Sequence, residues 1–359
     1  MHRLFTNILF MSALASSLYG QVQESFKLGT FEERGRIFLG LVLRDTLVVD
    51  ISRADVRPEG SKQAIPSDMR NLISRYQELR PRLYEIANAA ARATGTRPAY
   101  IRELKSLKIR PPVAPGTILN AAVNYVEHAN EMLPGGSNTS SSTLKEQDNI
   151  KKGIPGIWDR KPEDTRQNPY LFLKAPAAVI ADGEAIRIPP GREQVDWECE
   201  LNAVIGRPAS HVPVDRAADY IFGWTLQNDV SDRSVRADGR HGSDWFIAKS
   251  HDTFAPLGPF IVPKEFVKNP MKLSQKFMLS GKVMQNSSTD RMTHNVYEMV
   301  SFASNVMTLK PGDVVSMGSP AGVGAGRSQP VFMKNGDVSV CTIEGIGTLT
   351  NPVVGPDAH

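Results

Sequence analysis

Residues 195–206, VDWECELNAVIG, alternate strictly between apolar and polar side chains. The apolar set comprises Val195, Trp197, Cys199, Leu201, Ala203 and Ile205, and the polar set comprises Asp196, Glu198, Glu200 and Asn202. Alternation with a period of two predicts a β-strand that turns one face toward a core. Three carboxylates therefore share the opposite face of one strand.

Other short apolar segments with turn residues between them predict that the second part of the chain is rich in strands. These segments are residues 117–125, 169–176, 184–190, 221–231, 257–263, 313–319 and 337–353. Helical signals among them are short, as in residues 296–309. The pattern predicts an α+β fold in which strands dominate and form a roll or sandwich.

The first part of the chain mixes short strand-like segments over residues 26–52 with a longer helical pattern over residues 67–93. Ser67 is the candidate N-cap of this helix, and Pro81 is expected to kink or divide it. Apolar residues recur there at helical spacing, at Leu72, Ile73, Tyr76 and Leu79.

A cluster of prolines at residues 111, 112 and 115 indicates a domain boundary. We expect a small N-terminal domain over residues 21–110 and a larger domain over residues 111–359. Residues 133–168 are rich in Ser, Gly and Lys and form an inserted flap in this interpretation, because loops of such length are usually lids or disordered segments.

Residues 1–20 have the features of a secretory signal peptide. Arg3 supplies a positive start, and a mostly apolar segment with small residues near its end follows. We expect export to the periplasm or the medium, with no membrane attachment after cleavage. A membrane anchor and a misassigned start are the alternatives, and with a misassigned start the protein would be cytoplasmic.

Charge and cysteine content narrow the functional classes. The 42 basic and 38 acidic side chains are interspersed and give a net charge of +4, which does not indicate a nucleic-acid partner. The two cysteines, Cys199 and Cys341, each lie in an apolar segment. We interpret both as buried, inert thiols and expect no stabilising disulfide.

The three carboxylates of residues 196–200 call for a chemical explanation. Neighbours on one strand face lie about 7 Å apart, so enclosed carboxylates would repel one another. Asp229, at the end of another apolar segment, is well placed to join them. Three carboxylates suit a hard cation such as Mg²⁺ or Ca²⁺ rather than Zn²⁺. An exposed edge strand, with its charges screened by water, is the alternative.

A second candidate site lies in residues 124–132, NYVEHANEM. His128 and Glu131 are three residues apart and share one face of a helical turn. A carboxylate beside an imidazole fixes its tautomer and raises its basicity, which is the arrangement of a general base. An incidental surface pair is the alternative.

Together these segments resemble the fumarylacetoacetate hydrolase family, from about Pro115 to Val354. The resemblance rests on the order and spacing of NYVEHANEM, YLFLKAPAAVI, VDWECELNAVIG, GWTLQNDVSDRSVR, DWFIAKSHDTFAPLGPFIV, GDVVSMGSPAGVG and IEGIGTLTNPV. It implies a mixed β-roll or sandwich with a small N-terminal domain, and a homodimer. It also implies a Mg²⁺ site, with Mn²⁺ or Ca²⁺ as alternatives, formed by Glu198, Glu200 and Asp229.

The resemblance also implies roles for further residues. His128 and Glu131 would form the catalytic dyad, and Lys249 would stabilise developing negative charge. Asp196 would be a structural neighbour of the metal ligands, and Thr253 would support the metal region. The implied substrate contacts are Tyr125, Arg233, Arg236 and Ser319.

The implied function is that of a hydrolase acting on carbon–carbon bonds in ketonic substances. The substrate would be an acylpyruvate-like or fumarylacetoacetate-like diketo acid, attacked by water that the dyad activates. Alternatives within the family are a decarboxylase or isomerase of a related 2-oxo acid and a 2-keto-3-deoxy sugar-acid dehydratase. An inactive exported binding protein is the alternative of another class.

Overall fold

The computed structural model describes residues 23–55, 64–132, 153–161, 163–234 and 244–356. The expected signal peptide, Arg236 and the greater part of the inserted flap lie outside these ranges. No helix within them combines the length and the apolar character needed to cross a bilayer.

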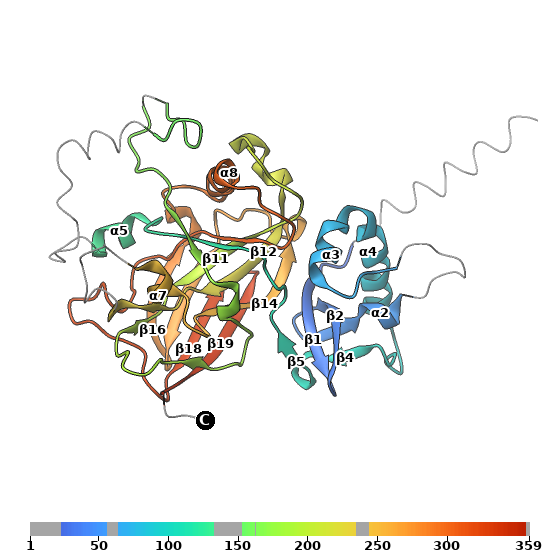
Figure 1. The fold of residues 1–359 in the computed structure, drawn as a ribbon. Helices are drawn as coiled ribbons and strands as arrows, with labels where there is room; N and C mark the ends of the chain where they lie inside the picture. The colour runs from blue at the N-terminus through green and yellow to red at the C-terminus, as the bar shows by residue number, and fades with distance from the viewer. Residues whose placement is uncertain (1–22, 56–63, 133–152, 162, 235–243, 357–359) are drawn as a thin grey trace, which may run out of the picture.

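The N-terminal unit is an antiparallel sheet covered by helices, and it lies to one side of the larger unit (Figure 1). Its strands are β1 (Lys27–Glu33), β2 (Arg36–Leu43), β3 (Leu47–Asp50), β4 (Ile101–Glu103) and β5 (Lys108–Arg110). Its helices are α2 (Ile51–Ala54), α3 (Met69–Ser74), α4 (Tyr76–Arg92) and the 3₁₀ turn η1 (Leu104–Ser106). The strands pair in the order β4-β3-β2-β1, and β5 also pairs with β1.

The helical segment of this unit differs in detail from the prediction. Leu72, Ile73, Tyr76 and Leu79 are buried, as the spacing predicted. The N-cap, however, is Asp68, whose side chain accepts a hydrogen bond from the backbone N–H of Asn71. The segment divides at Arg75, and α4 runs on through Pro81. The N-cap expected at Ser67 and the division expected at Pro81 are therefore wrong.

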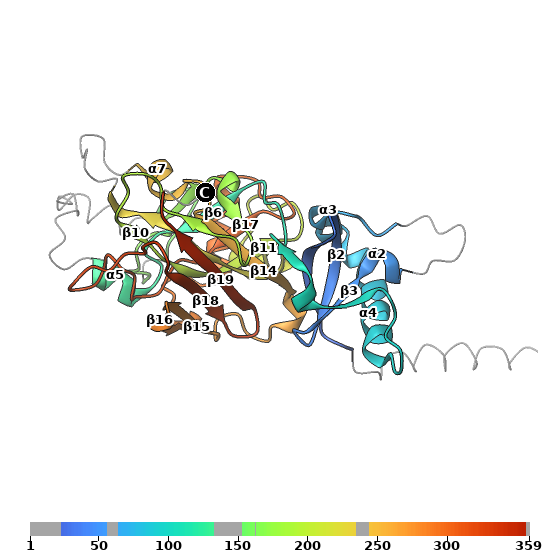
Figure 2. The same cartoon turned by 90° about the horizontal axis from the view of Figure 1, so that it is seen from below.

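The larger unit contains two open sheets that pack against each other (Figures 1 and 2). The first continues the N-terminal sheet, because β1 pairs with β14 and the order runs on as β14-β12-β11-β17-β6-β7. The strands of this part are β6 (Ile118–Ala121), β7 (Leu171–Lys174), β8 (Val179–Ile180), β11 (Cys199–Ile205), β12 (Ile221–Asn228), β14 (Ala255–Pro263) and β17 (Val314–Ser316). The two units therefore share one sheet.

The second sheet has the order β16-β15-β18-β19-β9. Its strands are β9 (Ile186–Arg187), β15 (Ser274–Leu279), β16 (Lys282–Ser288), β18 (Val338–Ile343) and β19 (Gly347–Val354). A two-stranded ladder joins β10 (Val195–Asp196) to β13 (Ser231–Asp232). The remaining helices and 3₁₀ turns are α5 (Val126–Met132), α7 (Trp245–Lys249), α8 (Val296–Val306), η2 (Pro176–Ala178), η3 (Val214–Asp219), η6 (Lys264–Phe266) and η7 (Thr289–Arg291).

The strand-rich α+β class is confirmed, and each strand-like segment predicted between residues 117 and 353 contains a strand. The β15–β16 hairpin was not predicted. The space between the two sheets forms the main core, where the ring of Trp197 stacks on Phe277 at a centroid separation of 5.3 Å. This core fixes the position of β11, which carries Glu200 and directly follows Glu198.

The alternating segment 195–206 is not one strand, because β10 ends at Asp196 and β11 begins at Cys199. β11 is a central strand between β12 and β17, and its polar face is buried as well as its apolar face. Glu198 is 6% exposed, and Glu200 and Asn202 are 0% exposed. The interpretation as an exposed edge strand is therefore wrong.

The expectation of free thiols is also wrong, because Cys199 and Cys341 form a disulfide. Cys199 lies on β11 in the first sheet and Cys341 on β18 in the second, with their Cα atoms 5.5 Å apart. They are 142 residues apart in sequence, and their proximity arises only when the two sheets pack. The bond joins the sheets directly beside Glu198 and Glu200.

Candidate active site

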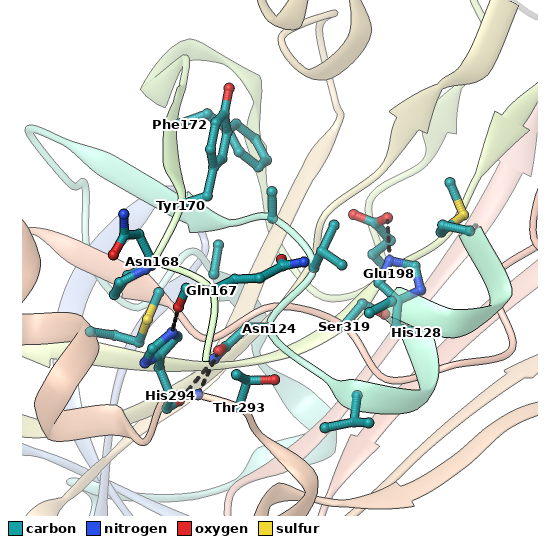
Figure 3. Close-up of a pocket in the computed structure, with 18 of the residues that line it drawn as sticks. Asn124, His128, Gln167, Asn168, Tyr170, Phe172, Glu198, Thr293, His294 and Ser319 are labelled. Atoms are coloured by element: carbon teal, nitrogen blue, oxygen red, sulfur yellow. Dashed lines mark hydrogen bonds and ion pairs between the residues drawn. The ribbon is translucent and has the colours of Figure 1, made fainter. Parts of the chain in front are cut away.

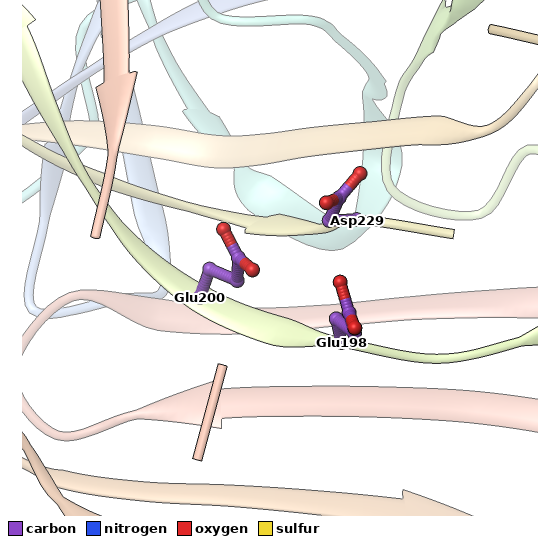
Figure 4. Close-up of side chains that lie close together, drawn as sticks. All are labelled: Glu198, Glu200 and Asp229. Atoms are coloured by element: carbon purple, nitrogen blue, oxygen red, sulfur yellow. The ribbon is translucent and has the colours of Figure 1, made fainter. Parts of the chain in front are cut away.

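The carboxylates of Glu198, Glu200 and Asp229 gather at one point in the first sheet. Each offers an oxygen, and these oxygens lie within 4.8 Å of one another (Figure 4). The strand pairing explains the gathering, because Cys199 on β11 lies opposite Asn228 on β12. The backbone N–H of Asp229 donates to the carbonyl of Glu198 at 2.7 Å, which brings the last of the three carboxylates to the other two.

Glu200 gives the strongest indication that this cluster can bind a cation. Its Oε2 accepts a hydrogen bond from the hydroxyl of Ser316, but its buried Oε1 has no partner among the described residues. Burial raises the pKa of Glu200 well above its usual value, and the charges of Asp229 and Glu198 raise it further. An unpaired carboxylate oxygen facing two other carboxylates fits a hard divalent cation.

Two lysine ammonium groups neutralise part of this negative charge. Nζ of Lys249 lies 2.6 Å from Oε2 of Glu198 and 2.6 Å from Oδ2 of Asp229. Burial alone would lower the pKa of Lys249, but the charges of Asp229 and Glu198 outweigh burial and raise it. Nζ of Lys174 lies 2.6 Å from Oδ1 of Asp229, and burial lowers the pKa of Lys174 to about 8.

Sequence analysis gave no role to Lys174, although it lies within the segment YLFLKAPAAVI. From the sequence alone, a lysine in a short strand is expected at the surface, since lysine is rarely buried unless it is paired. The pattern of β7 gives one indication, because Lys174 shares its buried face with Phe172.

Arg233 contacts two carboxylates of the site. One guanidinium nitrogen lies 2.6 Å from Oε1 of Glu198, and Nε lies 3.0 Å from Oδ2 of Asp196. Burial opposes ionisation of Glu198, yet Lys249 and Arg233 hold the pKa of this carboxyl well below its usual value. Arg233 lines the cavity, so it can still reach a bound anion, but its donors are shared with these two acids.

Asp196 organises the glycine-rich turn that follows β17. Its carboxylate accepts hydrogen bonds from the backbone N–H groups of Gly324 at 2.6 Å and Ala325 at 3.0 Å. A Cβ atom at residue 324 would lie 2.7 Å from Oδ1 of Asp196, so this approach requires glycine. Asp196 thus supports the wall of the site.

His128 and Glu131 lie together on one turn of α5. Nδ1 of His128 is 2.7 Å from Oε1 of Glu131, and Oε2 of Glu131 accepts from the backbone N–H of Gly322 at 2.8 Å. A carboxylate only accepts hydrogen bonds, so Nδ1 carries the proton and Nε2 is left as an acceptor. His128 is only 4% exposed, so the interpretation as an incidental surface pair is wrong.

Nε2 of His128 faces the carboxylate cluster, at 3.9 Å from Oε1 of Glu198. A cavity of about 730 Å³ opens beside these two residues (Figure 3). The residues that line it and define its shape include Ser319, Lys249, Phe172, Trp245, Asn168 and His294. Of the three carboxylates, Glu198 lines this cavity with His128, so the imidazole and this carboxylate can contact one small molecule.

The structure places three other predicted site residues, Tyr125, Ser319 and Thr253, in different surroundings. Tyr125 is fully buried, and its hydroxyl donates to Oε1 of Gln275 at 2.8 Å. The hydroxyl of Ser319 lines the cavity and accepts from Nε2 of Gln285 at 2.8 Å. The hydroxyl of Thr253 accepts a hydrogen bond from the backbone N–H of Arg187 at 2.8 Å. This hydrogen bond goes to strand β9 and not to a member of the carboxylate cluster.

Comparison with known proteins identifies the family of the chain. The family description fumarylacetoacetate (FAA) hydrolase C-terminal matches residues 117–354. A fumarylacetoacetate hydrolase domain-containing protein 2 homolog of Dictyostelium discoideum is 33% identical over 324 residues, covering 88% of this chain and 92% of that protein. The chain belongs to the fumarylacetoacetate hydrolase family.

Two further relatives differ in the reactions that their names describe. The mitochondrial oxaloacetate tautomerase fahd2 of Xenopus laevis is 38% identical over 188 residues, covering 52% of this chain and 59% of that protein. The crystal structure of maleylpyruvate hydrolase from Sphingobium sp. SYK-6 is 26% identical with a TM-score of 0.65, covering 92% of this chain and 99% of that chain. Members of the family thus include both an isomerising and a hydrolysing enzyme.

Proposed function

We propose that this protein is a divalent-metal-dependent tautomerase of a 2-oxo dicarboxylic acid of the oxaloacetate type. The observation that carries the proposal is the position of His128, whose acceptor Nε2 faces Glu198 where both residues line the cavity. The named activity of the Xenopus laevis relative supports the isomerase alternative over the hydrolase that sequence analysis favoured.

The metal would be held by Glu198, Glu200 and Asp229, with Mg²⁺ as the expected ion and Mn²⁺ or Ca²⁺ as alternatives. The fit rests on the buried, unpaired Oε1 of Glu200 and on the all-oxygen donor set. When bound, such an ion supplies Lewis acidity that polarises a carbonyl group.

The residues of the chain supply the proton transfers. Nε2 of His128 takes a proton from the carbon next to the substrate carbonyl and then delivers it to the carbonyl oxygen, which gives the enol. Glu131 holds the imidazole in the tautomer that has a free Nε2 and stabilises the imidazolium that forms. The ammonium of Lys249, which lines the cavity, stabilises negative charge that develops on the oxygen.

Carbon–carbon bond hydrolysis is the second candidate. The same free Nε2 could deprotonate a water molecule, and the similarity to maleylpyruvate hydrolase favours this chemistry. The two reactions differ in mass balance, because a tautomer has the mass of its substrate whereas hydrolysis adds one water and yields two products.

We propose that the mature chain is exported and forms a homodimer. The buried Cys199–Cys341 disulfide supports export, since such bonds persist in oxidising compartments and are rare in the cytosol of mesophiles. The homodimer rests on the family resemblance. Mass spectrometry of the secreted or periplasmic fraction tests the first proposal, and light scattering of the purified chain tests the second.

The experiment that tests the catalytic proposal follows the enol form of oxaloacetate by its ultraviolet absorbance, with Mg²⁺ and with a chelator. We expect Mg²⁺-dependent acceleration of the approach to keto–enol equilibrium, with no change in product mass. Acylpyruvates assayed in parallel test hydrolysis. Absence of acceleration, together with mass-verified cleavage of an acylpyruvate, would replace the tautomerase with the hydrolase.

A further inference from the structure

Lys174 is buried, although its strand, β7, lies at the edge of the sheet. β7 is the last strand in its order, and the adjacent Leu173 is 62% exposed. The side chain of Lys174, in contrast, is 0% exposed. Burying an ammonium group is costly unless specific partners compensate, so the contacts of Lys174 should explain its presence.

Those contacts are concentrated on one candidate metal ligand. Nζ of Lys174 donates to Oδ1 of Asp229 at 2.6 Å and to the backbone carbonyl of Val230 at 2.9 Å. Nζ of Lys249 donates to the other oxygen, Oδ2, at 2.6 Å. The carboxylate of Asp229 is thus held at both oxygens, and Lys174 ties it to the backbone of the next residue.

We propose that Lys174 is a positioning residue, which fixes the orientation in which Asp229 meets Glu198 and Glu200. This inference rests on the proposed function only in assuming that these three carboxylates bind a divalent cation. Because Lys174 does not line the cavity described above, its action on the reaction is indirect. Lys249 differs in this respect, since it lines the cavity.

Two simpler roles for Lys174 make different predictions. Anchoring of β7 does not require the lysine, because the backbone N–H of Ala175 donates to the hydroxyl of Ser250 at 3.1 Å and β7 pairs with β6 over four residue pairs. If Lys174 served only to neutralise charge, its removal would tighten metal binding, because a cation near the site repels a metal ion. Positioning predicts weaker binding when the lysine is removed.

The test is isothermal titration calorimetry of Mn²⁺ and Mg²⁺ with the full-length chain and with Lys174→Met, which keeps an unbranched side chain but has no donor. We expect metal affinity to fall roughly 10- to 100-fold, the usual effect of losing a residue that orients a ligand. Lys282→Met, at the exposed start of β16, is the matched control and should bind metal as the parent does. Circular dichroism verifies that each variant is folded.

Each outcome of the metal titration either supports or overturns the positioning role of Lys174. Equal or tighter metal binding by folded Lys174→Met would overturn it while leaving the proposed cation site intact. No metal binding by the parent chain would overturn both the inference and the cation site. If Lys174→Met does not fold, Lys174→Ala, which also has no donor and leaves room for water, takes its place with the same readout. Unchanged affinity in that variant would likewise overturn the positioning role.

Discussion

Nε2 of His128 lies 3.9 Å from Oε1 of Glu198, although His128 lies on α5 and Glu198 comes just before β11, about 70 residues later in the chain. Glu131 fixes the imidazole on one side, and Lys249 and Arg233 fix the carboxylate on the other. A proton acceptor and a candidate metal ligand are therefore held in one orientation before a substrate binds. Such preorganisation is what general-base catalysis beside a metal requires.

Replacement of the proposed base separates catalysis from metal binding. We expect His128→Gln to lower kcat by roughly 10²- to 10⁴-fold, the range for a positioned acid–base group, with metal affinity within about threefold of the parent. His211→Asn, at an exposed position with positive φ that Asn tolerates, is the matched control. Turnover of His128→Gln at the parental rate would remove the imidazole from the mechanism.

Glu200 gives a pH dependence whose sign follows from its burial. Its pKa in the folded, metal-free chain is raised, so its contribution to stability is present below the pKa of the unfolded chain. That contribution is lost as the pH rises through the folded-state value. A bound cation offsets the loss, because it favours the ionised carboxylate.

We therefore expect the increase in Tm caused by Mg²⁺ to grow as the pH is raised from 5 to 8. In Glu200→Gln, which cannot ionise, we expect both the increase and its pH dependence to be small. Thermal melting followed by circular dichroism, with Mg²⁺ or with a chelator at each pH, measures this. A Mg²⁺ effect that has the same pH dependence in parent and variant would exclude Glu200 as its source.

The disulfide between Cys199 and Cys341 should stabilise the chain substantially. A bond that closes a long loop restricts the unfolded chain, and removal of a native disulfide costs about 2–5 kcal/mol. We expect the double variant Cys199→Ala, Cys341→Ala to lose stability in this range in urea titrations. The alanine pair avoids burying an unpaired hydroxyl between the two sheets.

Thiol alkylation of the unfolded, unreduced parent provides the independent check on this bond. We expect no alkylated cysteine by intact mass unless a reductant is added first. Two labelled thiols without reductant would show that the bond does not form, and the support that it gives to export would fall with it.

The site was predictable from the sequence where the signal is local. Alternation over residues 195–206 identifies Glu198 and Glu200 as neighbours on one strand face, and the spacing of His128 and Glu131 on a helix places their side chains together. In the structure the carboxylates of Glu198 and Glu200 do lie together, and so do His128 and Glu131, although Glu198 lies between β10 and β11 rather than within a strand.

Other features depend on contacts between distant segments and leave no local pattern. Cys199 and Cys341 meet only because two sheets pack, and Lys174 meets Asp229 only because the fold brings β7 close to the residue that follows β12. The pairing of Arg233 with Asp196 and Glu198 also depends on contacts between distant segments.

The central claim is that the acidic cluster binds a divalent cation. Isothermal titration calorimetry of Mg²⁺ with the parent chain and with Glu200→Gln tests this claim most directly. We expect the parent to bind a single cation per chain and the variant to lose at least about tenfold in affinity, because the unpaired Oε1 of Glu200 would be a ligand. Equal affinity in both proteins, or no binding by the parent, would contradict the assignment of this acidic cluster as a metal site.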